Sequence, residues 1–155
     1  MLTFLLVVGV LGYIAWPYYT VYRLDRALVE NDEQELKKRI DLDAIRLQFK
    51  QKLDRQIEGV AEGYDNPILK FLRGGVKELG STSMEAIDYE WLRETIRTAQ
   101  ISRRARPHPL LGRFSFAFFE SPGRFLIRAG ELGENPVHLY MTFQPWQWRV
   151  TALFG

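Results

Sequence analysis

The first 22 residues constrain this chain more than any other stretch, because no charged side chain occurs between Leu2 and Tyr22. A helix rises about 1.5 Å per residue, so this stretch reaches roughly 30 Å, the thickness of a bilayer's hydrocarbon core. Pro17 is expected to mark either the exit from the lipid or a kink. We therefore predict a membrane anchor over residues 1–22. Its far end carries aromatic residues typical of headgroup level: Trp16, Tyr18, Tyr19 and Tyr22.

Two other interpretations of this stretch stay open at the level of sequence. A cleaved signal peptide has a basic segment before the apolar run and small residues before the cut. Here no Lys or Arg precedes the run, and bulky Tyr13 lies two positions before Ala15. A buried helix of a soluble protein is the other alternative. We expect an uncleaved anchor, in which small residues near one helix face allow close packing against another membrane helix: Gly9, Gly12 and Ala15.

Composition limits what the rest of the chain can do. About 130 residues follow the anchor, enough for one domain with its own core. The net charge of the 155-residue chain is only +2, which gives no electrostatic argument for nucleic-acid binding. Cysteine is absent, which excludes disulfides, thiolate chemistry and zinc sites built on Cys.

Helical periodicity dominates residues 23–106, which we assign to the helical part of the soluble domain. The anchor helix is expected to continue to Glu30 and to be followed by a short helix ending at Ile40. A longer helix with a narrow apolar stripe comes next, and two more are expected within residues 67–79 and 84–102. Three aspartates stand where helix N-caps belong: Asp32, Asp41 and Asp88.

The hydrophobic period changes from 3.6 to 2 after a basic, proline-broken linker at residues 103–109. Four alternating runs follow with turns between them, which predicts a four-stranded antiparallel meander over residues 107–155. One face of this sheet is apolar and is covered by the helices, so the fold class is α+β. Phe114, Phe116 and Phe118 are expected to share the core face of the first strand, or to line an apolar cavity beneath it.

Several short motifs along the chain carry a family resemblance through their order and spacing. The segment from Phe119 to Phe125 precedes a strand, and the first helix and the residues after it contribute Tyr22, Leu24, Ala27, Leu28, Asp32 and Leu36. The remaining motifs are Trp16-Pro17-Tyr18-Tyr19, Ile40-Asp41 before Ile45-Arg46, and a closing Trp148-Arg149-Val150-Thr151. With them, residues 16–153 resemble the bacterial domain-of-unknown-function family 2939, whose members typically begin with a hydrophobic segment.

This resemblance implies an anchored envelope protein whose soluble domain faces the periplasm. It supplies no activity and no catalytic residues. The positive-inside rule favours the opposite orientation, with the C-terminal side in the cytoplasm, because Arg23 and Arg26 follow the anchor directly. We predict the periplasmic orientation.

No convincing catalytic or metal-binding set is visible in the sequence. His108 lies between prolines in the linker and His138 on the polar face of a strand, and neither has a partner at metal-ligand spacing. The nucleophile elbow, the P-loop and the dinucleotide-binding glycine pattern are all missing. We predict no enzyme and no cofactor.

We therefore expect a non-catalytic, single-span protein of the bacterial inner membrane that is an accessory or structural subunit of a larger membrane protein assembly. The alternative is an envelope module that binds a lipid-like or other apolar ligand between helices and sheet. Contacts with a partner or with lipid headgroups are expected at basic and aromatic positions: Arg103, Arg104, Arg106, Trp146 and Trp148.

Overall fold

The computed structural model describes residues 1–58, 85–100, 110–133 and 135–155. The expected helix within residues 67–79 and the basic linker at 103–109 lie outside these ranges. In chain order the elements are α1 (Leu2–Glu30), α2 (Glu33–Arg39), α3 (Leu42–Glu58), α6 (Tyr89–Gln100), β1 (Phe116–Ser121), β2 (Arg124–Ala129), β3 (Val137–Gln144) and β4 (Gln147–Phe154). Helices precede an antiparallel sheet, so the predicted α+β class is confirmed.

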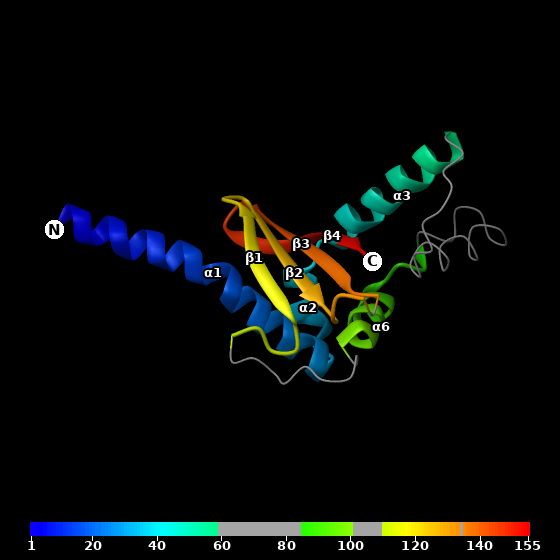
Figure 1. Cartoon of the computed structure of the whole chain (residues 1–155), viewed down its shortest axis with the longest axis horizontal. Helices are drawn as coiled ribbons and strands as arrows, with labels where there is room; N and C mark the ends of the chain where they lie inside the picture. Colours follow the sequence, from blue (N-terminus) through cyan, green and yellow to red (C-terminus); the bar gives the residue numbers. More distant parts are fainter. Residues whose placement is uncertain (59–84, 101–109, 134) are drawn as a thin grey trace.

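α1 is a single helix of 29 residues whose N-terminal part projects far beyond the domain (Figure 1). Pro17 lies inside it without ending it, and the Thr20 hydroxyl one turn later donates to the Trp16 carbonyl at 3.2 Å. The helix ends where Asn31 adopts a left-handed conformation, with φ 56°, and the Asp32 N–H bonds the Ala27 carbonyl at 3.0 Å. The chain then turns sharply into α2.

The three predicted N-caps are confirmed. Asp32 accepts a hydrogen bond from the Glu35 N–H at 3.1 Å, and Asp41 accepts one from the Ala44 N–H at 3.1 Å. Asp88 does the same at the start of α6, where the Trp91 N–H lies 2.7 Å from its carboxylate. Each cap satisfies a backbone donor that the first turn of a helix leaves unpaired, which stabilises the helix by about 1 kcal/mol.

The sheet has the strand order β1-β2-β3-β4, as expected for a meander. Its inner face packs against the helices and forms the core together with α1, whose side chains Val21 and Leu24 are fully buried. The sheet contributes side chains that are also fully buried: Phe125, Ile127, Leu139, Met141, Trp148 and Val150.

The outer edge of β4 is closed by the helical layer. The Asp41 N–H bonds the Val150 carbonyl at 2.8 Å, and the amide side chain of Gln48 bonds both the N–H and the carbonyl of Leu153, at 2.9 and 3.1 Å. Arg149 donates to the carbonyl of Ile40 at 3.0 Å, at the end of α2. These bonds satisfy edge groups that would otherwise pair with another chain.

The expectation that three alternate phenylalanines share the core face was wrong. Phe114 is buried but precedes β1, in a turn where its N–H bonds the Leu111 carbonyl at 3.1 Å. The strand alternation therefore starts only at Phe116. Phe116 and Phe118 lie on the outer face of the sheet, 40% and 59% exposed, and Phe119 packs inward instead.

Candidate functional site

The surroundings of α1 change abruptly along its length. Residues 1–12 are all exposed, and Tyr13 is the first residue of the helix to pack against the domain. The Tyr13 ring centroid lies 5.9 Å from that of Phe143 and 6.1 Å from that of Trp148. Its hydroxyl donates to the carbonyl of Pro122, in the turn between β1 and β2. The domain therefore begins, along the helix, at Tyr13.

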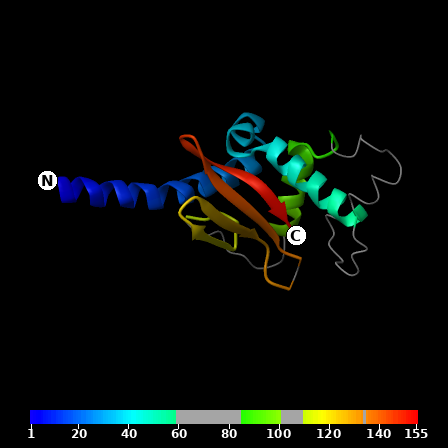
Figure 2. The ribbon, with the colours of Figure 1, turned by 90° about the horizontal axis from the view of Figure 1, so that it is seen from above.

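Both hairpin turns at this end of the sheet reach the same level of α1. The β1–β2 turn contacts Tyr13 through Pro122, and the end of β3 contacts Trp16, whose ring centroid lies 5.9 Å from that of Phe143. Both turns lie on the side of α1 that the sheet covers (Figure 1), and seen from above they are displaced to either side of the helix axis (Figure 2). The helix thus leaves the domain beneath two hairpin tips, Pro122-Gly123 and Pro145-Trp146.

Exposed aromatic rings surround this exit point. We call the set Tyr13, Trp16, Phe143 and Trp146 the aromatic collar. Trp16 is 40% exposed, Phe143 38% and Trp146 85%. Trp146 follows Pro145 with a φ of 71°, a conformation that such a turn normally reserves for Gly or Asn. A bulky residue in this region costs roughly 1–2 kcal/mol, so two unfavourable features in water, strain and exposure, coincide at one residue.

The other predicted interface aromatics fall into two groups. Tyr18 packs inward, with its ring 5.0 Å from that of Phe125 in an edge-to-face arrangement. Tyr19 and Tyr22 lie on the open face of α1 and are 55% and 43% exposed. Trp148 is fully buried, so it is not available for the expected partner or lipid contact. Successive side chains of β4 point to opposite faces of the sheet, so Trp148 faces the core while Arg149 points the other way and donates to the Ile40 carbonyl.

The small residues of the projecting segment are open to a partner. A Cβ atom added to Gly9 or Gly12 would meet nothing within 4 Å, and Ala15 is exposed. Arg103, Arg104 and Arg106 lie outside the described residues, so the structure does not place them.

A buried carboxylate fixes the second half of α1 to the rest of the domain. Asp25, only 9% exposed, accepts hydrogen bonds from the Arg113 N–H at 3.2 Å and from the Gln100 side chain at 3.3 Å. Burial raises the pKa of Asp25, and the bond from Arg113 acts in the opposite direction. Gly112 lies directly against this carboxylate, since a Cβ there would be 2.2 Å from the Asp25 oxygen Oδ2.

A second polar contact joins α1 to α2. Arg23 lies 3.0 Å from the Glu35 carboxylate, which also accepts from Lys38 at 3.0 Å. Hydrogen bonds from Lys38 and Arg23 lower the pKa of Glu35 to about 2. Together with the Asp25 contacts, these bonds make the C-terminal half of α1 an integral part of the domain.

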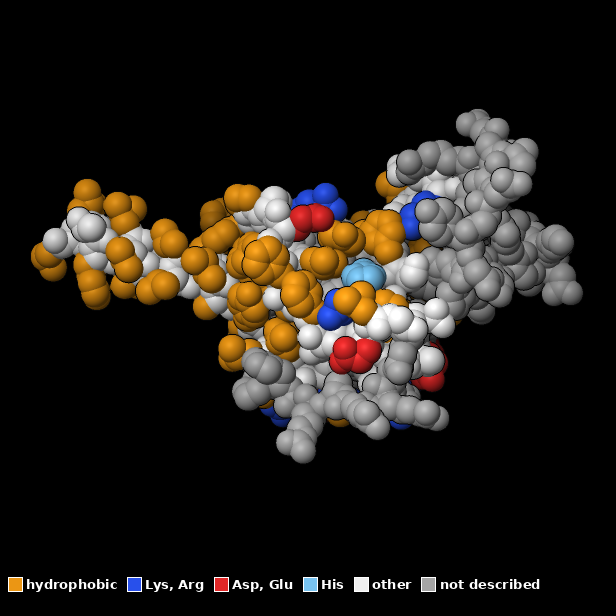
Figure 3. All heavy atoms as spheres, in the orientation of Figure 1, with side chains coloured by type: hydrophobic (Ala, Val, Ile, Leu, Met, Phe, Trp, Pro, Cys, Tyr) orange, Lys and Arg blue, Asp and Glu red, His pale blue; other side chains and the backbone are white. Residues whose placement is uncertain are grey.

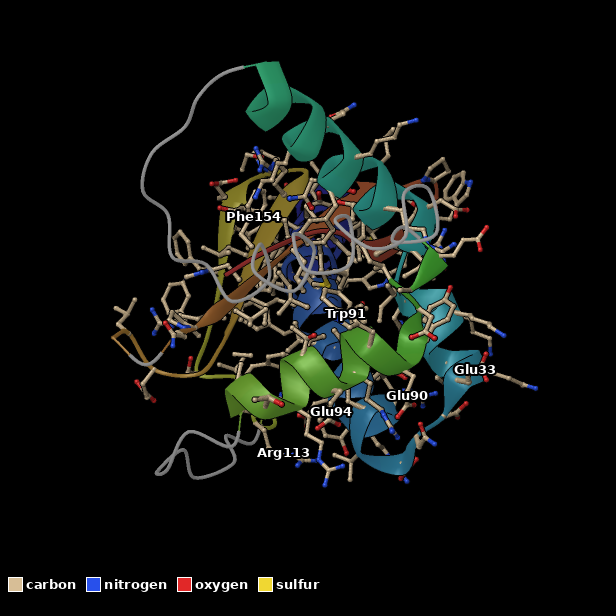
Figure 4. The ribbon with its side chains drawn as sticks, turned by 90° about the vertical axis from the view of Figure 1, so that its right-hand side faces the viewer. Glu33, Glu90, Trp91, Glu94, Arg113 and Phe154 are labelled. Atoms are coloured by element: carbon tan, nitrogen blue, oxygen red, sulfur yellow. The ribbon has the colours of Figure 1, made fainter. Side chains whose placement is uncertain are left out.

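A shallow depression of about 260 Å³ lies at the other end of α1, beside its last residue and the starts of α2 and α6. Figure 4, which faces that end, shows Glu33 and Glu90 on its rim. Glu33 is paired with Lys37 at 2.6 Å, Glu90 with Arg93, and Asp88 serves as a helix cap. These carboxylates already have partners, and within the described residues no cluster of three or more potential metal ligands exists. The depression supports no chemistry that we can assign.

Fold and site together define a small α+β domain built on an N-terminal apolar helix. Among the described residues, α1 alone is long and apolar enough to cross a membrane, a property it shares with signal sequences. A family model described as "Protein of unknown function (DUF2939)" matches residues 6–87, more than half of the chain. The chain therefore belongs to this family, as the sequence motifs indicated. No curated protein and no solved structure matches it.

Proposed function

We propose that the protein is a non-catalytic, single-span protein of the bacterial inner membrane, with its soluble domain in the periplasm. In this proposal it serves as an accessory or structural subunit of a larger membrane protein assembly. The observation that carries the proposal is the continuity of α1, which runs without a break from a fully exposed apolar segment into the core of the domain.

This continuity makes the anchor and the domain one mechanical unit. A flexible linker would let the domain turn freely about its anchor, whereas Asp25 and Arg23 fix the rotation of α1 relative to α2, α6 and the segment before β1. A membrane helix that packs against the projecting segment would therefore also set the orientation of the domain. Such coupling suits a subunit that positions a surface rather than one that transforms a substrate.

The small residues of the projecting segment supply the helix-packing surface that the proposal requires. Gly9 and Gly12 are one turn apart and lie in open space, so another helix can approach the backbone closely there. Leucine at both positions would hold the partner helix away. Val7 and Val10 have the same spacing on a different face and are exposed, so their replacement by leucine is a matched control.

The test is mild detergent extraction of the tagged full-length protein from its native membranes, followed by sizing and identification of what accompanies it. We expect a stoichiometric set of membrane proteins with the wild type and with the V7L/V10L control. The G9L/G12L variant should be extracted equally well but without that set. Purification of the wild type alone would refute the assembly role. Association that survives G9L/G12L would refute the packing surface at Gly9 and Gly12.

Orientation needs its own measurement. We expect a C-terminal alkaline phosphatase fusion to be active and a C-terminal cytoplasmic fluorescent-protein fusion to be dark, because the domain is proposed to be periplasmic. The reverse pattern would place the domain in the cytoplasm, as Arg23 and Arg26 alone would favour.

The alternative, a module with an apolar ligand between helices and sheet, has no specific observation in its favour. Rings fill the described space between α1 and the sheet, with centroid distances of 4.9 Å between Phe119 and Phe125 and 5.0 Å between Tyr18 and Phe125. Trp148 closes the same cluster, 5.9 Å from Phe119.

A further inference from the structure

We propose that the domain sits directly on the bilayer, with both hairpin tips and the aromatic collar in the lipid headgroup region around α1. This surface therefore contacts the lipid headgroups of the membrane. The inference rests on the proposed function in one respect, since it requires that the projecting part of α1 lie in a bilayer.

Both hairpin tips lie beside the part of α1 where the helix leaves the domain. The tip at Pro122 is tied to Tyr13, and the tip that carries Trp146 begins at Phe143, which contacts Trp16. Both tips lie on the sheet side of α1 (Figure 1), displaced to either side of its axis when seen from above (Figure 2). A plane drawn across α1 between Tyr13 and Trp16 therefore meets both tips. A bilayer that surrounds the helix up to this level must touch them.

α1 stays uncharged well past the level at which the domain begins. The first charged residue of α1 is Arg23, which lies about 15 Å beyond Tyr13 along the helix axis. The headgroup region on each side of a bilayer is roughly 5–7 Å thick. When the tips are at the lipid boundary, Arg23 is already in water. No charged side chain of α1 has to enter the membrane for the domain to sit on it. The helix from Leu2 to Trp16 is about 22 Å long, shorter than the roughly 30 Å hydrocarbon core, so this position requires the bilayer to thin around α1.

The surface that the two tips present is uncharged. The tip residues Pro122, Gly123, Pro145 and Trp146 are uncharged, and large aromatic rings with a polar atom are favoured at the membrane–water boundary. Figure 3 shows hydrophobic side chains extending from the projecting helix onto the adjoining part of the domain.

The charged side chains on either side of the β1–β2 tip pair with each other. Glu120 and Arg124 flank the β1–β2 turn and pair at 3.2 Å, and the Arg124 guanidinium also lies 4.9 Å from the centre of the Tyr140 ring. A long arginine side chain at this depth can keep its charged end among the headgroups. The pair is therefore compatible with a position at the boundary.

The opposite end of the sheet provides the contrast. The β2–β3 turn carries Glu131 and Leu132, and Leu132 is 70% exposed although it is far from the point where α1 leaves the domain. We therefore expect Leu132 to remain in water despite its exposure. What distinguishes the tips is their common level beside the exposed helix.

The experiment uses the absence of cysteine from the chain. Single cysteines replace Gly123, Gln147 and Leu132 in the full-length protein, which is reconstituted in vesicles of phosphatidylethanolamine and phosphatidylglycerol. Gly123 and Gln147 report on the two tips and leave the collar rings in place. A cysteine at Leu6 reports on the anchor. Each carries an environment-sensitive fluorophore, which is exposed in turn to spin-labelled lipids and to aqueous iodide.

We expect lipid-borne quenching several-fold stronger at positions 123 and 147 than at 132, with iodide quenching in the reverse order. Position 6 should be quenched by lipid alone. Lipid quenching at 6 with full iodide access at 123 and 147 would overturn the seating of the domain and leave the anchor intact. Iodide access at position 6 would overturn the anchor itself, and the seating with it.

Discussion

The two halves of α1 are one continuous helix with opposite surroundings. The half before Tyr13 exposes its apolar side chains on every side, with Phe4 72% and Leu11 60% exposed. The half after it buries Val21 and Leu24 completely against the sheet and α2. The length of an apolar stretch therefore does not by itself locate a membrane boundary. We propose that the boundary lies where the domain begins to cover the helix.

The largest difference between the halves is expected when a leucine is shortened in each. Leu24→Ala should lower the free energy of unfolding by about 3 kcal/mol, because it removes a fully buried side chain and leaves a cavity. Leu6→Ala should leave domain stability unchanged, because Leu6 is 62% exposed and contacts no core. Denaturation in detergent micelles, followed by near-ultraviolet circular dichroism, measures both. Equal effects would contradict the division of the helix.

A smaller effect is expected at the contact between the second half of α1 and the segment before β1. Gly112→Ala should destabilise by about 1–3 kcal/mol, because φ is +60° and the new Cβ would overlap the Asp25 carboxylate. Gly133→Ala is the matched control, since φ there is +94° but nothing lies within 4 Å of an added Cβ. If the two variants lost the same stability, backbone strain alone would be responsible and Asp25 would not be in contact.

Acid should weaken the contact between α1 and α2. The pKa of Glu35 is about 2 in the folded protein and 4.5 ordinarily, so its contribution is complete above pH 4.5 and is lost as the pH falls through 2. The Glu35 side chain is partly exposed, so we expect less than about 1 kcal/mol. Glu35→Gln should lower the free energy of unfolding by this amount already at pH 7. Below pH 4.5 the difference in free energy of unfolding between the variant and the wild type should become smaller. A difference that stays constant down to pH 2 would show that the ionised Glu35 carboxylate does not stabilise the contact.

The smallest effect is expected at Asp25, and its pH dependence has the opposite sign. Burial raises the pKa of Asp25 above its ordinary value of 3.8, so the wild type loses stability as the pH rises from 3.8 to the folded pKa. Asp25→Asn keeps an oxygen acceptor for Arg113 and Gln100 and removes the charge. As the pH rises from 3.8 to the folded pKa, the free energy of unfolding of the variant should therefore increase relative to that of the wild type. At pH 7 the two proteins should be close in stability. A large loss at pH 7 would show that the charge itself is needed.

Local sequence signals predicted the elements of the fold well. The caps at Asp32, Asp41 and Asp88 and the four strands depend on short-range hydrogen bonding and alternation, which are visible in the residues themselves. These signals did not predict the register of β1, because Phe114 belongs to a preceding turn and the strand alternation begins two residues later.

The candidate site was predicted only in part for the same reason. Trp16 and Trp146 were recognised as interface residues, and both are exposed in the aromatic collar. Tyr13 and Phe143 were not recognised, because their role depends on two hairpin tips meeting the helix at one level. Trp148 looked equivalent to Trp146, but Trp146 lies in the turn before β4 with a φ of 71°, whereas Trp148 belongs to β4 and faces the core. The residues gave chemical character, while tertiary packing decided which of them reach the surface.

The most direct test of the central claim is an accessibility scan of α1 in a bilayer. Single spin labels at Leu6, Ile14, Tyr19 and Val29, all exposed on the helix, compare collisions with oxygen, which enters lipid, and with a nickel chelate, which stays in water. We predict oxygen access at 6, a crossover between 14 and 19, and chelate access at 29. Oxygen access persisting to position 29, or chelate access already at 6, would contradict a membrane boundary at the aromatic collar.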